Sequence, residues 1–554
     1  MKIFFTLFLC CKFFFVTAQW NNNPAVNNLI ASTPGDDYLT TLISDGAGGS
    51  IHFFNIGNDD VYAQKISAMG VLQWGGTTNP VKVCDATNQQ EDIVAIPDGS
   101  GGAFVAWSDY RHSNDSGEIY IQHISATGLP LWAANGQRIT TSLTIDDYGP
   151  GLCADGSGGV IVSWSRDNNI DDIQVFAQRI NSAGTMQWVS NGVQVCTAPG
   201  FRVGNTIVSD GSNGFISIFV DSRNDPNGLD YDYLSGNELT NGDIYAQRIN
   251  GNGNRLWTDN GVAVCTAGGN QGAFEFNTAI PDGNGGVMFA YDDGRNDVLD
   301  INGDPTNNDM YVQKLNNNGV SQWAQNGVPV SNAGGNQFIT NVSTDGSGGI
   351  VVLFENFPVN TMYAQRVIST GTVAWAVNGI AVTAPGQNSY DAKITADGAG
   401  NIIVAYIEDI TKQLRAQKLG STGTFLWGTG GVSISNTGSN QRDVEIVASG
   451  NGSAIASWSD SRILVSTNTD VFASKILSTG VLDGIGTTTF VTAANGNWNS
   501  PSTWVGGVVP TINAVVTVKH NVTVTANATC KSLKVETASG RVTVKTGLKL
   551  TVTN

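Results

Sequence analysis

One stretch of the chain, Asp243–Val264, returns in modified form along most of its length. It reads DIYAQRINGNGNRLWTDNGVAV: an alternating segment, an Asn/Gly turn, and a second strand expected from Leu256–Trp257 with Val262–Val264. This pattern is typical of two antiparallel β-strands joined by a tight turn. Further copies begin at Asp60, Glu118, Val175, Met310, Met362, Arg415 and Val471, and the last of them lacks the Trp. The chain is therefore an array of repeated β units.

A second landmark precedes each copy. An Asp-Gly pair between apolar runs, which is typical of a hairpin turn, stands at Asp45, Asp98, Asp155, Asp210, Asp282, Asp345 and Asp397, and the last unit has Ser449-Gly instead. Successive landmarks lie 52 to 72 residues apart. Each unit then reads as four antiparallel strands, here called a to d in chain order. Four short strands per unit are the signature of a β-propeller blade.

The two ends of the array predict how the ring closes. The last unit has Val481-Leu482-Asp483 where the Trp before strand d is expected, whereas QWNNNPAV from Gln19 matches the segment QWAQNGVPV from Gln322. We therefore expect an all-β fold with an eight-bladed β-propeller, in which residues near Trp20 form the outer strand of the last blade. That pairing also covers two sheet edges. Seven blades are the alternative, if the last unit is degenerate.

The chain divides into four segments. Residues 1–18 combine a lysine, an apolar run and small residues before the cleavage position, which predicts a secretory signal peptide. Residues 19–484 hold the propeller, 485–494 a linker, and 495–554 a segment of different character with V-x-V couplets. No other apolar run reaches the ~18–20 residues needed to span a bilayer. We expect a secreted protein, extracellular or at the outer cell surface, with no transmembrane segment.

Two parts of the sequence resemble known families. The Gly-x-x-x-Trp spacing, as in Gly253/Trp257, is similar to the tryptophan-docking turns of eight-bladed quinoproteins, whose cofactor pocket has no counterpart here. GNWNSPSTWVGGVVP from Gly496 resembles the module that opens a parallel β-helix in large secreted bacterial surface proteins. The W-x-D-x-R…D-I-Y-A-Q-R array also looks like repeats of such proteins, many of them exported by the type IX route. The resemblance implies a short parallel β-helix or solenoid-like module over 495–554, truncated in mid-ladder.

The charge of the array restricts its partners. Because residues 1–18 hold two Lys, and residues 485–554 hold six Lys or Arg and one Glu, residues 19–484 carry 20 basic and 45 acidic side chains. A body with a net charge of −25 disfavours nucleic acid and anionic membrane surfaces. We expect a monomeric propeller that binds an extracellular glycan or protein.

Five cysteines remain outside the signal peptide, and we expect them to be unpaired, small and partly buried. Three of them share one repeat position, at which other units carry Ser or Thr: Cys84, Cys196 and Cys265 against Thr140, Ser331, Thr383 and Ser435. Equivalent positions in neighbouring units should lie beyond the ~7 Å between Cα atoms that a disulfide allows. Disulfides, which are common in exported proteins, are the alternative for these and for Cys153 and Cys530.

Candidate ligand-binding residues lie in the loops between strands b and c, which vary between units. An aromatic-x-Asp-x-Arg motif ends strand b in four units and gives the pairs Asp109/Arg111, Asp221/Arg223, Asp293/Arg295 and Asp460/Arg462. Such a pair can bind an anionic sugar or a peptide carboxylate. The alternative is an ion pair that orders the loop and is repeated because the fold is repeated.

Two acidic insertions in the b–c loops predict a Ca²⁺ site. Asp300-x-Asn302-x-Asp304 resembles the start of a Ca²⁺ loop, since closely spaced oxygen ligands suit that ion, and Asp225, Asp230 and Asp232 form a second cluster. Solvated, turn-rich loops are the alternative. No other cofactor is indicated.

Two functions compete at this point. The four copies of the Asp–Arg motif favour a secreted or cell-surface binding and adhesion protein, which recognises glycan or protein through its b–c face and has no catalytic residues. The alternative is a carbohydrate-active hydrolase or lyase whose carboxylates come from several blades, because a glycosidase needs two carboxyl groups about 5–9.5 Å apart.

Overall fold

The computed structural model describes residues 20–552 except 58, 114–115, 168–172, 226–241, 273–277, 298–306, 358–359, 385, 463–467, 485–488, 506–508, 511–513, 531 and 537–539. The chain forms two compact units, Pro24–Leu482 and one that joins Asp483–Asn554 with the residues before Pro24. Each unit is described by itself below. Among the described residues no helix is long and apolar enough to cross a membrane.

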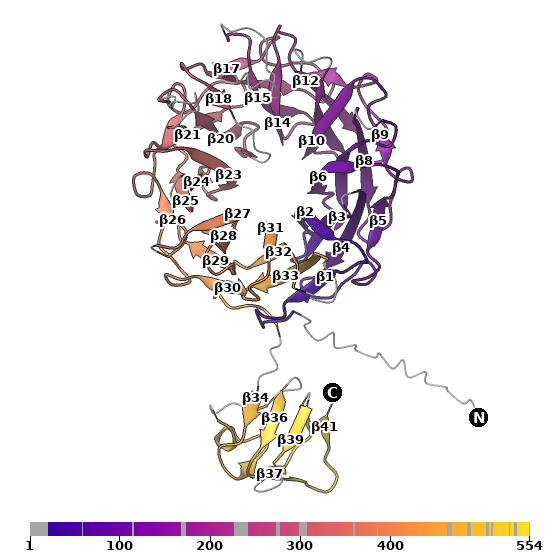
Figure 1. The fold of residues 1–554 in the computed structure, drawn as a ribbon, viewed down its shortest axis with the longest axis vertical. Helices are drawn as coiled ribbons and strands as arrows, with labels where there is room; N and C mark the ends of the chain where they lie inside the picture. The colour runs from indigo at the N-terminus through magenta and orange to yellow at the C-terminus, as the bar shows by residue number, and fades with distance from the viewer. Residues whose placement is uncertain are drawn as a thin grey trace, which may run out of the picture. The chain divides into compact units, whose positions relative to one another are not determined.

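The larger unit is a ring of eight antiparallel sheets, numbered blades 1 to 8 (Figure 1). Blades 1 to 4 consist of β2 (Asp37–Ser44), β3 (Ser50–Ile56), β4 (Asp60–Ile66) and β5 (Val81–Cys84); β6 (Gln90–Pro97), β7 (Ala103–Asp109), β8 (Glu118–Ile124) and β9 (Gln137–Arg138); β10 (Asp146–Ala154), β11 (Val160–Asp167), β12 (Ile173–Ile180) and β13 (Val193–Gln194); and β14 (Arg202–Ser209), β15 (Phe215–Asp221), β16 (Asp243–Ile249) and β17 (Val262–Cys265).

Blades 5 to 8 continue the pattern, and in blade 5 strand a is split in two. They consist of β18 (Gln271–Gly272), β19 (Ala279–Pro281), β20 (Val287–Asp293), β21 (Asp309–Leu315) and β22 (Val328–Ser331); β23 (Gln337–Thr344), β24 (Ile350–Asn356), β25 (Thr361–Val367) and β26 (Ile380–Ala381); β27 (Ser389–Ala396), β28 (Ile402–Glu408), β29 (Leu414–Leu419) and β30 (Val432–Ser435); and β31 (Gln441–Ala448), β32 (Ala454–Asp460), β33 (Asp470–Ile476) and β1 (Asn28–Ala31). Strand a of each blade lies nearest the centre of the ring and is called the inner strand (Figure 1).

The ring closes as predicted, because β1 is the outer strand of blade 8. It pairs antiparallel with β33, with Leu29 opposite Phe472. Ile30 and Ala31 are fully buried in this pairing. The chain therefore forms an eight-bladed propeller whose first strand completes its last blade.

The structure corrects one expectation about the repeat. Strand d of blade 4 begins at Val262, and the expected strand residues Leu256–Trp257 lie outside it. After a single bridge between Ile249 and Arg255, the chain leaves the ladder, and the Trp257 indole donates a hydrogen bond to Asn317 of the next blade (3.2 Å). The Trp therefore makes a contact between neighbouring blades and takes no part in strand pairing within its own blade.

The repeated Trp joins each blade to its successor. Its indole N–H donates to a backbone carbonyl in the next blade's c–d turn, and the pairs are Trp74 to Ala126, Trp132 to Ser182, Trp188 to Gly251, Trp257 to Asn317, Trp323 to Ser369, Trp375 to Ser421 and Trp427 to Ser478, at 3.0 to 3.4 Å. A glycine packs on the ring: a Cβ at Gly253, where φ is 82°, would lie 3.1 Å from Trp188. The Trp residues therefore pack between blades.

Two other repeated residues also have structural roles. The amide of Gln247 accepts a hydrogen bond from the Trp257 backbone N–H (3.2 Å) and donates one to the Thr258 carbonyl (2.6 Å), so it holds the c–d turn. In the Asp-Gly turn of blade 6, Oδ1 of Asp345 accepts from the backbone of Gly349 (2.7 Å) and Oδ2 pairs with Arg366 (2.9 Å). These contacts explain why the same residues recur in almost every unit.

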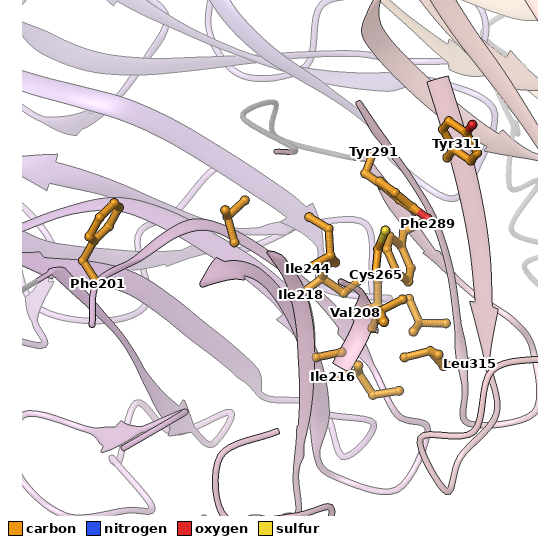
Figure 2. Packing of buried hydrophobic residues seen from close by; sticks show 14 of the residues in the cluster. Phe201, Val208, Ile216, Ile218, Ile244, Cys265, Phe289, Tyr291, Tyr311 and Leu315 are labelled. Atoms are coloured by element: carbon orange, nitrogen blue, oxygen red, sulfur yellow. The ribbon is translucent and has the colours of Figure 1, made fainter. Parts of the chain in front are cut away.

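Apolar clusters fill the spaces between blades. Figure 2 shows the cluster between blades 4 and 5, in which Ile218 of β15, Phe289 of β20 and Cys265 of β17 come together, all 4% exposed or less. Each blade buries both faces against its neighbours, because the strands in its middle carry near-continuous apolar runs such as FISIFVD in β15.

The smaller unit contains short parallel sheets. The pairings are β34 (Thr489–Val491) with β36 (Val515–Val518) and β39 (Ser532–Val535), β35 (Gly496–Asn497) with β37 (Asn521–Val524) and β40 (Arg541–Val544), and β38 (Ala528–Cys530) with β41 (Leu550–Val552). A 3-10 helix spans Pro501–Thr503. Trp498 and Trp504 are buried together, with ring centroids 5.1 Å apart.

Candidate functional site

The Asp–Arg pairs predicted to bind a ligand lie between neighbouring blades. In blade 2, Asp109 is fully buried, and its carboxylate accepts hydrogen bonds from Nε1 of Trp107 (2.7 Å, to Oδ2) and from Nε of Arg111 (2.7 Å, to Oδ1). The Arg111 guanidinium stacks on Tyr120, with its carbon 3.8 Å from the ring centroid, and donates to the Asn135 carbonyl (2.8 Å). Both oxygens of this carboxylate are thus used inside the protein.

The same arrangement recurs in blades 4, 5 and 8. Nη2 of each Arg reaches the outer strand of the preceding blade, in the pairs Arg111 to Cys84, Arg223 to Cys196 and Arg295 to Cys265, each 3.3 Å, and Arg462 to Ser435, 3.0 Å. The four carboxylates, of Asp109, Asp221, Asp293 and Asp460, are fully buried. The geometry favours the alternative of a repeated structural ion pair, and ligand binding by these residues stays a prediction.

The five cysteines outside the expected signal are all buried, and Cys84, Cys153, Cys196 and Cys265 are free, as predicted. Burial raises the pKa of Cys84 and of Cys265 to about 11. These thiols therefore remain protonated near neutral pH and act as small packing groups beside the Arg residues.

The expected Ca²⁺ ligands fall mostly outside the described residues. Asp230, Asp232, Asp300, Asn302 and Asp304 are not described, and Asp225 donates its backbone N–H to the Ser222 carbonyl (2.9 Å). Within the described ranges, no group of three or more His, Cys, Asp or Glu side chains is arranged to hold a metal ion. The Ca²⁺ site on these insertions stays a prediction.

A different group of acidic residues occupies the inner strands. In β27 of blade 7 and β31 of blade 8, the pairing with strand b is shifted by a β-bulge, and each bulge holds an aspartate in the left-handed region: Asp391 with φ 47° and Asp443 with φ 56°. The Asp391 carboxylate faces blade 8 and lies 3.2 Å (Oδ2) and 3.3 Å (Oδ1) from the Val444 backbone N–H. Such backbone strain, of order 1–3 kcal/mol, is concentrated at functional sites.

Four ionisable side chains meet on these two strands. Nζ of Lys393 lies 3.5 Å from Oε1 of Glu445, and both side chains are partly exposed, 29% and 24%. The pKa of Asp391 is raised to about 6, chiefly by burial, with the hydrogen bond from Val444 lowering it and the charge of Asp443 raising it. Burial also raises the pKa of Glu445, which the charge of Lys393 lowers and those of Asp391 and Asp443 raise. The two strands therefore present carboxyl groups whose pKa values are raised above their ordinary ones, that of Asp391 to about 6.

Aromatic side chains flank this acidic group. They share one register position near the start of the inner strand and are Tyr38, Tyr148, Phe338 and Tyr390, paired across to Asn55, Ser165, Glu355 and Ile407. Phe338 is 46% exposed and the three tyrosines are partly exposed. At the same position of blade 8, the Arg442 guanidinium lies 4.6 Å from the Tyr38 ring centroid. The carboxyl groups thus lie next to half-exposed rings at the centre of the propeller.

The sequence analysis looked to the b–c loops and did not predict this group. One signal was present: the inner strands SYDAKITA and QRDVEIVA carry Asp391, Lys393, Asp443 and Glu445 between their apolar residues. From the sequence alone, such charges indicate a solvent-exposed face of the strand, unless the strand is known to lie at the centre of a ring.

No family model and no curated protein match this sequence. Solved structures of similar fold include puromycin hydrolase (11% identity, 80% of this chain and 61% of that one, TM-score 0.42) and an ulvan lyase of polysaccharide lyase family PL25 (10%, 73% and 96%, 0.42). A further one is the alpha-L-arabinanase of Penicillium chrysogenum (12%, 69% and 91%, TM-score 0.32). The chain thus spans 61% of the length of puromycin hydrolase. At this level of identity the similarity concerns the fold alone.

Proposed function

We propose that the protein is a carbohydrate-active hydrolase or lyase whose acid and base groups lie on the inner strands of blades 7 and 8. The observation that carries this proposal is the carboxyl group of Asp391, which has a pKa of about 6 in a strained backbone position beside Asp443, Glu445 and Lys393. A general acid or base works best when its pKa lies near the working pH.

The chemistry of either reaction suits this arrangement. A glycosidase needs one protonated and one ionised carboxyl group, and environments that push two carboxyl pKa values apart supply both. Here Lys393 lies against Glu445 and favours its ionised form, whereas burial favours the protonated form of Asp391. A lyase would use the same groups to remove a proton next to a sugar carboxylate, with Lys393 balancing the charge that develops.

The flanking rings support a sugar as the substrate. Sugar rings present C–H faces that pack on aromatic side chains, while their hydroxyl groups need polar partners nearby. Tyr38 and Tyr390 lie at equivalent positions of blades 1 and 7, on the two sides of blade 8, which carries Asp443 and Glu445. A chain of sugars lying across these strands would contact the rings and the carboxyl groups together.

The binding and adhesion hypothesis loses its main argument. It rested on the four repeated Asp–Arg pairs, and their carboxylates are buried and bonded between blades. The proposal therefore takes up the enzymatic alternative and leaves retention without turnover as an outcome of the test.

We further propose, from the sequence, that residues 1–18 are a signal peptide and that the protein is secreted or displayed at the outer cell surface. The parallel pairings of the smaller unit support the proposal that it is the beginning of a parallel β-helix. On this view it acts as a spacer or attachment module beside an enzymatic ring.

The test is a panel of neutral and acidic polysaccharides incubated with the purified protein. A hydrolase releases reducing ends, a lyase also produces unsaturated sugars that absorb in the ultraviolet, and a binding protein retains polymer without product. We expect Asp391→Asn and Glu445→Gln each to lower turnover by about 10²–10⁴-fold, with retention kept. Asp85→Asn, an exposed carboxylate paired with Lys82, is the matched control. Retention with no product from any polymer would overturn the enzymatic proposal.

A further inference from the structure

The first residue of strand c carries a carboxylate in several blades, and blade 2 shows how it is neutralised. Glu118 stands opposite Asp109 and is 1% exposed. Its Oε1 pairs with Arg138, the residue opposite Tyr120 on the outer strand, and its Oε2 lies 2.7 Å from Nδ1 of His112. Both oxygens of this buried carboxylate therefore have a basic partner.

Blade 5 has the same carboxylate without those partners. Asp309 stands opposite Asp293 and is fully buried. The position of Arg138 is taken by Pro329, opposite Tyr311, and Asn296 contributes only an amide, 2.8 Å from Oδ2 of Asp309. The other oxygen, Oδ1, is buried and has no hydrogen-bond partner among the residues that the structure describes. An unpaired buried oxygen of this kind costs several kcal/mol unless something binds it.

The surroundings of Asp309 are more acidic than those of Glu118. Blade 5 places Asp292 and Asp297 near the buried pair Asp293 and Asp309, and the charges of Asp309 and Asp293 act on Asp297 after burial has raised its pKa. Of these four carboxyl groups, Asp293 pairs with Arg295, and the charge of Arg295 also acts on Asp309. In blade 2 two carboxylates, Asp109 and Glu118, have two guanidiniums, Arg111 and Arg138. Blade 5 therefore lacks the second guanidinium that blade 2 provides, since Pro329 stands at its position.

We propose that blade 5 binds a divalent metal ion, with Ca²⁺ the best suited, through Oδ1 of Asp309 and the carboxylate of Asp297. A hard divalent cation takes carboxylate oxygens and completes its shell with carbonyl oxygens and water, so two carboxylates suffice as its charged ligands. Asp297 and Asp309 lie in the same b–c segment of blade 5 as the predicted Asp300, Asn302 and Asp304 but are different residues, and they belong to another blade than the inner strands of blades 7 and 8. The site therefore stands independently of the proposed function.

Calcium chloride added to the chelator-treated full chain tests the proposal, with magnesium chloride in a parallel series. We expect saturable binding by calorimetry and a rise in melting temperature with Ca²⁺, because a ligand that binds only the folded state stabilises it by mass action. Asp309→Asn and Asp297→Asn should each abolish both effects. Glu118→Gln, at the equivalent position of blade 2, should keep them.

The melting temperatures of the metal-free proteins show whether Asp309 is a metal ligand or a hydrogen-bond acceptor that only stabilises the fold. Asn at position 309 removes a buried charge whose Oδ1 has no hydrogen-bond partner among the described residues, so chelated Asp309→Asn should melt at or above the temperature of the chelated wild type. A lower melting temperature would show that Asp309 is a structural acceptor and would overturn the proposal. The proposal would also be overturned if the wild type bound no Ca²⁺, which would mean that a proton neutralises Asp309. Ca²⁺ binding that persists in Asp309→Asn would overturn it as well.

Discussion

Replacing Arg111 with methionine tests whether the Asp–Arg pairs hold neighbouring blades together. Methionine keeps much of the apolar volume but removes the guanidinium that donates to Asp109 and to the Asn135 carbonyl. Asp109 is fully buried, so its carboxylate would lose its only charged partner among the ion pairs of the described residues. Breaking a buried ion pair from one side costs about 3–5 kcal/mol. We expect Arg111→Met to lower the free energy of unfolding by that amount.

The control is an ion pair of the same types at the surface. Lys82 and Asp85 are 50% and 38% exposed, and pairs of this kind contribute about 0–1 kcal/mol. Lys82→Met should therefore unfold at nearly the same urea concentration as the wild type, followed by tryptophan fluorescence. Our interpretation is wrong, and the pair is a ligand site, if two results are found together. Arg111→Met would then unfold at the same urea concentration as the wild type, and it would no longer be retained on an immobilised glycan or peptide that retains the wild type.

Three further predictions concern other parts of the propeller. Burial raises the pKa of Asp391 to about 6, so the folded protein binds this proton more tightly than the unfolded chain does. The stability that this proton contributes is therefore lost as pH rises through about 6, and the fall in melting temperature between pH 4 and 7 should be smaller in Asp391→Asn. Ile30→Ala removes a fully buried side chain of β1 and should cost about 2–5 kcal/mol, with faster amide exchange in β33, whereas Val26→Ala, 50% exposed, should cost little. Gln247→Ala leaves the Trp257 N–H and the Thr258 carbonyl unpaired and should cost about 1–3 kcal/mol by urea denaturation.

The ring was predictable because one weak signal is repeated eight times. A single Asp-Gly pair or Gly-x-x-x-Trp spacing says little, but the same residues must recur wherever the same contacts recur, as Trp257 and Gln247 show. The ends were predictable for the same reason, since the segment after Trp20 matches the outer strands of other blades. The boundary of strand d was not, because the contact that turns Trp257 away from its own sheet lies in the next blade.

The acidic group at the centre could not be predicted in the same way. Asp391 and Glu445 belong to different repeats, and their proximity follows from two inner strands that lie side by side in the ring. The bulges also hide the pattern, because one extra residue shifts the alternation and places Asp391 and Asp443 in a conformation that a sequence does not display. The proposed blade 5 site could not be predicted for a further reason. Asp309 is set apart from Glu118 by the absence of a basic partner such as Arg138, and that partner comes from a strand distant in the sequence.

The pairing of β1 with β33 places the first and the last strand of the propeller in the same sheet. Because Leu29 meets Phe472, this sheet is the last that a growing chain can complete, and β1 stays without its partner strand until β33 has been made. Every other blade consists of hairpins between neighbouring segments, whose contacts form early because little chain separates them. A circular permutant that joins β33 to β1 through a c–d turn and opens the chain between β5 and β6 would turn this long-range pairing into a local one. Such a chain would keep all eight blades and would build every one of them from neighbouring segments.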